Sequence, residues 1–169
     1  MPERMVDPIF LYLRISEVTG DRLFHLSCKV NVKQYLERDF NRIAVLRVCD
    51  GTRTLKNFRK WDLEETSEEY EDEVFAPPNS EEVDIIVMTN VNRLESVNVG
   101  DFILLKNITC TPLEAILNDE VIVFYELSMK NEDSIIRRLQ KHDQAVKDIK
   151  RALEKRQMKE KLIAVKTLF

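Results

Sequence analysis

The chain has 169 residues, 44% of them hydrophobic, and a formal net charge of −4, which is the composition of one soluble domain with an appendage. Its longest apolar runs are far shorter than the ~20 residues that a membrane span needs. Charged residues occupy the N-terminus, where a signal peptide would have its apolar core. We therefore expect an intracellular protein that does not engage a membrane.

The cysteines are three in number and dispersed, at Cys28, Cys49 and Cys110. This pattern fits neither a disulfide framework nor a closely spaced pair of metal ligands, and His25 and His142 are the only histidines. We expect buried thiols, no metal site and no cofactor. The sequence contains no glycine-rich phosphate loop, HExxH motif or nucleophile elbow, so we do not expect an enzyme.

The charge is distributed unevenly along the chain. Residues 137–169 contain eleven Lys or Arg and four Asp or Glu, a balance of +7, and subtracting this from the net −4 leaves −11 for residues 1–136. Much of the negative charge lies in residues 64–73, which lack periodicity and are typical of a solvated loop. The alternative is an acidic surface for a basic partner.

The first predicted elements are an N-terminal extension, residues 1–21, and a strand over residues 26–33. The extension has an apolar run before the turn signal Thr19-Gly20-Asp21, which predicts a short strand or helix. In the strand, apolar and polar residues alternate strictly, with Lys29, Asn31 and Lys33 in the polar row. This polar row fits either a nucleic-acid groove or a plain solvated face.

A second strand, residues 43–49, follows a connection over residues 35–41. It ends in a tight Asp50-Gly51 turn, which presents short polar and charged side chains. Residues 56–61 then interleave the aromatic residues Phe58 and Trp61 with three cations. Aromatic faces stack on unpaired bases and cations meet phosphates, so this composition favours single-strand binding. The alternative is that the two aromatic residues belong to the core or its rim.

Three further strands are predicted, over residues 83–89, 101–109 and 121–128. Between them, residues 91–97 are expected to form a turn or two of helix, Thr111-Pro112 to break a strand, and residues 113–119 to form a hairpin loop. About five strands with long loops predict a mainly β protein with a single OB-fold, a five-stranded Greek-key barrel, over residues 22–130.

The C-terminal segment, residues 131–169, contains no Gly or Pro and is predicted to be one long α-helix. Its apolar stripe consists of Ile135, Leu139, Val146, Ile149 and Leu153. We expect the first half of this helix to pack across the barrel. The basic end beyond residue 153 is open to four interpretations: a partner-binding helix, a dimerisation helix, an auxiliary DNA contact or the frayed end of a domain.

The element order and loop lengths over residues 26–139 resemble the second OB-fold of the protection-of-telomeres family, which holds single-stranded telomeric DNA. The most specific part is Arg47-Val48-Cys49-Asp50-Gly51-Thr52-Arg53-Thr54, where the family has a basic residue two positions before an aromatic-Asp-Gly-Thr turn. The family usually has tryptophan at Cys49, a stacking aromatic residue at Met88 and histidine at Ser128. These departures imply a different affinity or base preference. The chain contains one OB-fold where known members use two in tandem, which implies weaker binding of a shorter strand.

The resemblance implies sequence-preferring binding of single-stranded telomeric DNA, with the G-rich strand favoured. It places the protein at chromosome ends in the nucleus, in end protection and telomere length regulation. The predicted DNA-binding residues are Lys29, Asn31, Lys33, Arg47, Asp50, Thr52, Arg53, Phe58, Trp61, Thr89, Asn90, Asn92, Tyr125 and Lys130. Among them, Phe58 and Tyr125 are the expected stacking platforms.

The alternative function is an OB-fold protein-interaction module of a telomere or DNA-maintenance complex, with little DNA binding of its own. The acidic residues 64–73 or the C-terminal helix would then be the docking surface. The −11 balance of residues 1–136 favours this alternative.

Overall fold

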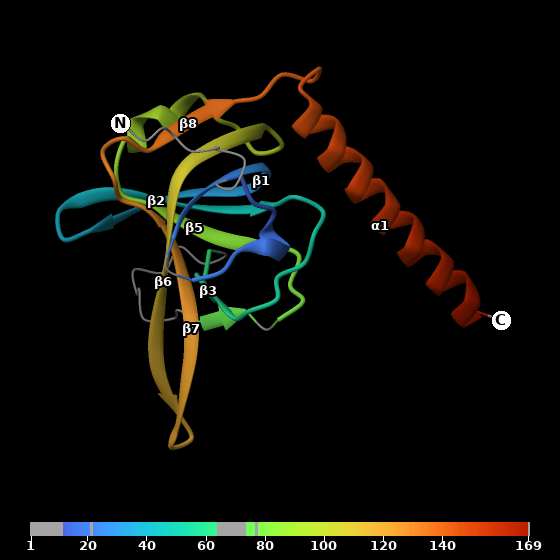
Figure 1. Ribbon diagram of the computed structural model, residues 1–169, viewed down its shortest axis with the longest axis horizontal. Helices are drawn as coiled ribbons and strands as arrows, with labels where there is room; N and C mark the ends of the chain where they lie inside the picture. The colour runs from blue at the N-terminus through green and yellow to red at the C-terminus, as the bar shows by residue number, and fades with distance from the viewer. Residues whose placement is uncertain (1–11, 21, 64–73, 77, 169) are drawn as a thin grey trace, which may run out of the picture.

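The computed structural model describes residues 12–20, 22–63, 74–76 and 78–168. The acidic run over residues 64–73 and most of the predicted N-terminal extension lie outside the described residues. Within the described ranges, the chain folds into one strongly curved sheet, from which a long helix projects (Figure 1). None of the described helices is both long and apolar enough to cross a bilayer.

The described strands are β1 (Leu23–Arg38), β2 (Asn41–Cys49), β3 (Phe58–Lys60), β4 (Val74–Ala76), β5 (Val83–Val87), β6 (Phe102–Leu117), β7 (Glu120–Met129) and β8 (Ile135–Arg138). The helices are the short 3-10 helices η2 (Ile15–Glu17) and η3 (Val91–Ser96) and the α-helix α1 (Gln144–Leu168). The sheet order is β4-β3-β7-β5-β2-β1-β6-β8, and an additional β6–β7 pairing closes the barrel. Strands β1, β2, β5, β6 and β7 form the OB barrel, so the predicted fold class is confirmed, with three accessory strands.

The hydrophobic core lies inside the barrel, where alternate residues of each strand point. On β2 these are Ala44, Leu46 and Val48, all fully buried. A second, smaller cluster lies on the outer face of the sheet, where Trp61 and Leu63 pack on the remaining apolar residues of β2 and on β5. The segment after β3 therefore covers part of the outer sheet face.

A β-bulge in β1 changes the predicted alternation. Val30 pairs with Val48, but Val32 pairs with Arg47, so Asn31 is the extra residue. One extra residue reverses the faces of all residues that follow it. Val32 therefore packs on the outer cluster, and Lys33 lies opposite Leu46 on the other face, against the prediction that Lys29, Asn31 and Lys33 share one polar row.

The sequence predicted that the strand breaks at Thr111-Pro112, and this prediction is wrong. Strand β6 continues to Leu117 and pairs with β7 up to Leu117↔Glu120. Pro112 lacks an N–H group, which a strand tolerates at an edge. Pro112 sits beyond the part of β6 that pairs with β1 and β8, so β7 is its one neighbouring strand among the described residues. The expected loop is thus a projecting two-stranded hairpin, residues 112–124, which we call the arm.

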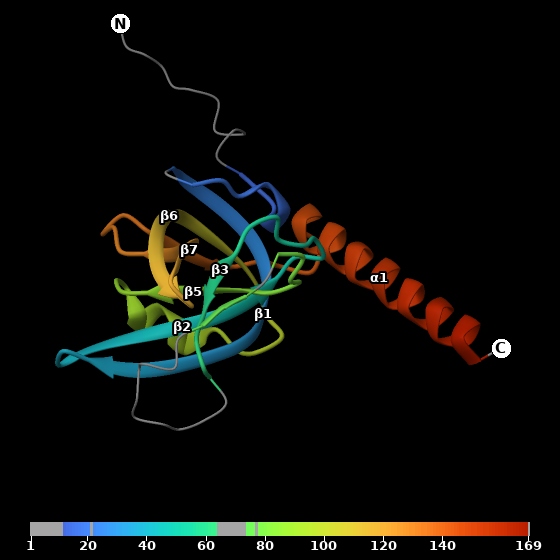
Figure 2. The ribbon, with the colours of Figure 1, turned by 90° about the horizontal axis from the view of Figure 1, so that it is seen from below.

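The predicted C-terminal helix begins later than expected. Residues 135–138 form β8, which pairs with β6, so Ile135 and Leu139 do not belong to the helical stripe. The N–H groups of Val146 and Lys147 donate to the carbonyl of Asp143, where α1 begins. Val146 and Ile149 are buried, in agreement with the stripe, and the later turns of α1 extend away from the barrel (Figure 2).

Candidate nucleic-acid interface

A cavity of about 510 Å³ opens on the outer face of the barrel beside the covered part of the sheet. Its walls come from the middle of β1, from the end of β2, from β3, from the segment before β5 and from α1. The polar and charged residues that line it are Lys29, Asn31, Arg47, Arg59, Lys60, Ser80, Glu81, Glu82, Asp84 and Gln157. Of the predicted DNA-binding residues, the structure brings Lys29, Asn31, Arg47 and Phe58 together here.

The Arg47 side chain is held by an internal ion pair. Its Nε and Nη2 atoms donate to the two carboxylate oxygens of Asp84 at 2.7 and 2.9 Å, and Nη2 also donates to the Trp61 carbonyl at 2.7 Å. The N–H group of Trp61 donates to Asp84 at 2.8 Å. Both charged residues are buried. Arg47 therefore fixes the segment that covers the sheet, instead of meeting a phosphate as the sequence suggested.

Asp50 and Thr52 organise the turn after β2. Asp50 Oδ2 accepts the N–H group of Ile15 at 2.8 Å, and Asp50 Oδ1 accepts the N–H and hydroxyl groups of Thr52 at 2.9 and 2.6 Å. Thr52 Oγ1 in turn accepts the N–H group of Ser16 at 3.0 Å. These bonds give both residues a turn-capping role. Arg53, by contrast, is exposed and lies 3.4 Å from the carboxylate of Glu81.

Helix α1 lies directly over this turn. Arg156 donates to the Gly51 carbonyl at 2.7 Å and forms a 3.0 Å ion pair with Glu81. A Cβ atom at Gly51 would lie 2.4 Å from the Cβ atom of Ala152. The turn that carries the family resemblance is therefore packed against the C-terminal helix.

The two aromatic residues of the 56–61 segment are core residues. Phe58 is 2% exposed and Trp61 is 4% exposed, so neither offers a face to a base, and the prediction of Phe58 as a stacking platform is wrong. Tyr125 is half-buried, with its ring centroid 6.2 Å from that of Phe58 and 5.1 Å from the Lys56 ammonium.

The remaining predicted residues lie away from the cavity. Lys33 donates to the carbonyls of Leu94 and Val97 at 2.9 and 2.6 Å and thereby closes the end of η3. Thr89 and Asn90 donate to backbone carbonyls of residues 131–134. Asn92 and Lys130 are exposed, and none of these five residues lines the cavity.

The sequence reasoning missed Phe40, at the tip of the β1–β2 hairpin. This side chain is fully exposed, and its φ of 66° is uncommon for a bulky residue. Arg38 and Arg42 flank it, and the Arg38 guanidinium lies 5.8 Å from the Trp61 ring centroid. The cation-aromatic-cation pattern of residues 38–42, in a connection between two strands, was the signal that could have identified this tip.

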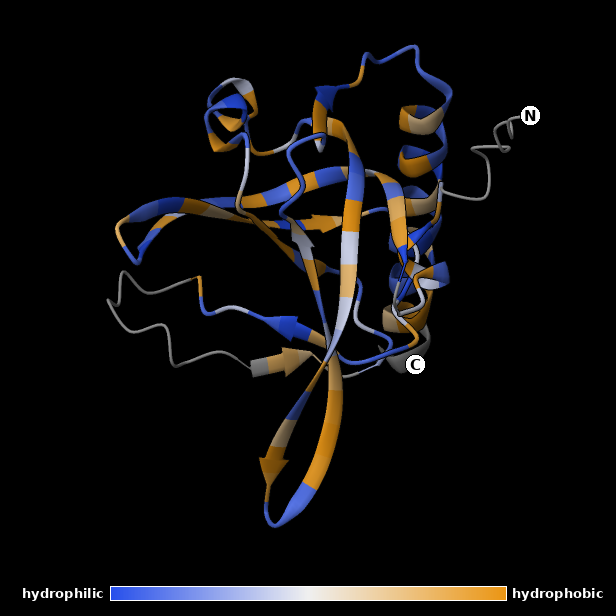
Figure 3. Cartoon of the chain, turned by 60° about the vertical axis from the view of Figure 1, so that its left-hand side comes forward, coloured by the Kyte–Doolittle hydropathy of each residue, from blue (hydrophilic) through white to orange (hydrophobic). Residues whose placement is uncertain are grey.

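The two hairpins that flank the outer sheet face differ in charge. OB-folds bind oligonucleotides through this face and the loops beside it, which here are the β1–β2 hairpin and the arm (Figure 3). The β1–β2 tip, residues 37–42, carries Arg38 and Arg42 against Glu37 and Asp39, a balance of zero, whereas residues 112–124 carry Glu114, Asp119 and Glu120 and no Lys or Arg, a balance of −3. The less anionic part of this face therefore runs from the cavity to the β1–β2 tip.

Two buried cysteines, Cys28 and Cys49, lie near the turn after β2. Burial raises the pKa of the Cys28 thiol, and burial also raises the pKa of the Cys49 thiol, so both thiols stay protonated at neutral pH. Among the residues that the structure describes, no three His, Cys, Asp or Glu side chains form a possible metal site.

Comparison with known proteins gives similarity at the level of structure. No family model and no curated protein sequence matches the chain. The crystal structure of fission yeast Pot1 with ssDNA matches at 14% identity and a TM-score of 0.59, over 85% of this chain and 44% of that one. Schizosaccharomyces pombe Pot1pC bound to ssDNA (CGGTTACGGT) matches at 15% identity and a TM-score of 0.56, over 85% and 96%. The chain thus spans less than half of the first structure, and the likeness establishes that its barrel is an OB-fold.

Proposed function

We propose that this chain binds single-stranded DNA along the outer face of the barrel, from the cavity to the tip of the β1–β2 hairpin. The observation that carries the proposal is the exposed Phe40 between Arg38 and Arg42, on the same hairpin that places Lys29 and Asn31 in the cavity wall. Lys60 of β3 lines the same cavity. Two proposed contacts, Lys29 and Asn31, are among the residues predicted from the sequence. The structure adds four more, which are Arg38, Phe40, Arg42 and Lys60.

The physical argument rests on what a single strand exposes. Its unpaired bases stack on aromatic faces, each worth about 1–3 kcal/mol, and its phosphates attract cations. Because residues 1–136 carry a charge of −11, bulk charge attraction does not hold the strand. Stacking and a few local cations therefore have to supply the affinity.

We further propose that the natural ligand is the G-rich strand of telomeric DNA, bound at chromosome ends in the nucleus, with a role in end protection and no catalysis. The resemblance of residues 47–54 and the likeness to two Pot1 structures determined with ssDNA support this. Cys49 and Met88 stand where the family has aromatic residues, so the base preference has to be measured.

A fluorescence-anisotropy titration with short oligonucleotides tests both proposals. The ligands are the two telomeric strands and a polypyrimidine control, with a duplex as competitor. We expect saturable binding, tightest for the G-rich strand, and poor competition by the duplex because its bases are stacked and paired. Equal affinity for all single strands would remove only the telomeric assignment. No saturable binding to any of them at micromolar protein would remove DNA binding itself.

A second candidate function is a protein-interaction module. The observation that favours it is the arm, whose apolar side chains are exposed although its charge repels nucleic acid. If no single strand binds, this candidate becomes the better account of the domain.

A further inference from the structure

The arm exposes an apolar ribbon that nothing in the described chain covers. Ile116, Val121 and Val123 are 74%, 63% and 47% exposed. Ile116 pairs with Val121, and Val123 pairs with Glu114, so these side chains share one face of the ribbon. Figure 3 shows both strands of the arm as hydrophobic over most of their length. A two-stranded hairpin is marginally stable in water by itself, and an apolar patch of this kind marks an interaction site.

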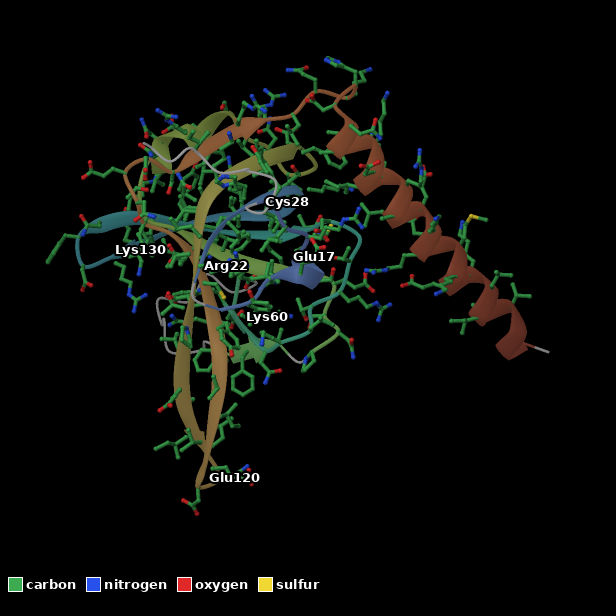
Figure 4. All side chains as sticks on the ribbon, in the orientation of Figure 1. Glu17, Arg22, Cys28, Lys60, Glu120 and Lys130 are labelled. Carbon is green, nitrogen blue, oxygen red and sulfur yellow. The ribbon has the colours of Figure 1, made fainter. Side chains whose placement is uncertain are left out.

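The arm is also purely anionic. Its three charged residues, Glu114, Asp119 and Glu120, are exposed carboxylates, and Glu120 lies at its tip (Figure 4). A partner that covers the ribbon should therefore bring apolar side chains surrounded by cations.

The projecting end of α1, residues 158–168, has this character. Met158, Leu162 and Val165 are 65%, 59% and 51% exposed and follow the i, i+4, i+7 spacing of one helix face. At about 100° per residue, this face lies roughly opposite the stripe that packs on the barrel. Three exposed lysines, Lys155, Lys159 and Lys161, lie nearby and outnumber the two exposed glutamates, Glu154 and Glu160.

The two surfaces match in length but cannot meet within one molecule. Eleven residues of helix extend about 16 Å, and the six residues of β6 in the arm extend about 20 Å. In Figures 1 and 3 the arm and the helix end leave the barrel at different places and stand apart. Only another molecule can bring a helix end onto the arm.

We propose that this molecule is a second copy of the chain, with the helix end of each copy packed on the arm of the other. Such a reciprocal exchange has two-fold symmetry, so it closes as a dimer and does not propagate into a filament. The apolar face of the helix covers the ribbon, while the lysines meet the arm carboxylates at the rim. The outer sheet face of each barrel is not part of this contact.

Light scattering after size exclusion, without DNA, tests the proposal across the micromolar range. The wild-type chain should approach twice the 19.9 kDa of one chain as its concentration rises. In the arm variant E114K/E120K, the arm and the helix end are both cationic. In the helix variant K155E/K159E/K161E, the arm and the helix end are both anionic. Each variant alone should run as a monomer, and an equimolar mixture of the two should recover the dimer.

The matched control is E132K/K141E, which reverses two exposed charges outside both surfaces and should dimerise as the wild type does. Truncation after Gln157 removes the helix end without altering the barrel and should give a monomer even if a charge variant folds poorly. A wild-type monomer at every concentration overturns the proposal, and so does a mixture that stays monomeric or a dimer that survives the truncation. Because no DNA is present, this result is independent of the anisotropy titration.

Discussion

At the scale of single residues, Phe40 and Phe58 have opposite environments. Phe58 is 2% exposed in the core, so Phe58→Ala should lower the free energy of unfolding by about 3–5 kcal/mol. Phe40 is fully exposed, so Phe40→Ala should change the free energy of unfolding by less than about 0.5 kcal/mol. The same substitution should weaken binding of a single strand by about 1–3 kcal/mol, because it removes a stacking face. Urea melts and anisotropy measure the two effects.

The control for Phe40→Ala is Val99→Ala, which truncates a side chain that is 63% exposed on the segment after η3. It should change neither stability nor binding. If Phe40→Ala binds the strand with wild-type affinity, the β1–β2 tip is not part of the interface.

His25 should make stability depend on pH. Its Nδ1 accepts the N–H group of Asn107 at 3.1 Å, which requires a neutral ring. Burial, and then the charge of Lys106, lower the pKa of His25 below its ordinary 6.5. The unfolded chain therefore binds this proton first, so the stabilisation is complete above about pH 6.5 and is lost as pH falls from there through the folded pKa.

The measurement is the free energy of unfolding at about pH 7.5 and about pH 5.5, on the two sides of the ordinary histidine pKa. The wild type should lose more stability between them than His25→Gln, whose side chain does not titrate. Equal losses in the two proteins would show that His25 does not contribute to acid sensitivity.

At the scale of elements, the contact between α1 and the turn after β2 depends on Gly51. Gly51 and Gly100 have similar positive φ angles, +91° and +97°, so alanine at either position should cost about 1 kcal/mol of backbone strain. At Gly51 the new Cβ would also meet Ala152 at 2.4 Å, whereas Gly100 has nothing within 4 Å. Gly51→Ala should therefore destabilise the domain more than Gly100→Ala in thermal melts. Equal melting temperatures would mean that α1 does not dock on the turn.

The contacts of Arg156 determine how much of α1 contributes to the stability of the domain. The sequence stripe predicts that truncation after Leu153 leaves stability within ~0.5 kcal/mol of the full chain. Arg156 moves this boundary, because it bonds to the Gly51 carbonyl and to Glu81. We expect truncation after Gln157 to be nearly neutral and truncation after Leu153 to cost about 1.5–3 kcal/mol, the scale of hydrogen bonds to a charged group. Denaturant melts of the two truncated chains decide between the two boundaries.

At the scale of the whole molecule, an acidic domain that binds an anion should show a weak dependence on salt. Each phosphate contact to a single strand adds about 0.7 to the slope of log K against log salt, so the four proposed cations give a slope of about −3 at most. Lys60→Ala should reduce this slope by about 0.7, and Lys147→Ala, on the exposed side of α1, should leave it unchanged. A steep slope that Lys60→Ala does not alter would place the phosphates elsewhere, for example on the basic helix.

The sequence by itself determined the elements and the fold class. Residues 43–49 were predicted to be a strand and lie in β2, and the predicted stripe that contains Val146 and Ile149 belongs to a helix that packs on the barrel. Five strands in that order predicted the OB-fold, which the structure confirms. These features are local, because the side-chain period of a strand or helix is read from neighbouring residues.

The tertiary structure decided which side chains face solvent and which are held inside. Arg47 is paired with Asp84 and Phe58 is in the core, while Phe40, in a segment that the sequence treated as a connection, stands fully exposed. A single extra residue at Asn31 turned Lys33 to another face. None of these outcomes follows from periodicity, because each depends on a partner far along the chain or on the register between two strands. Composition indicates which residues can bind DNA, and long-range packing decides which of them can reach it.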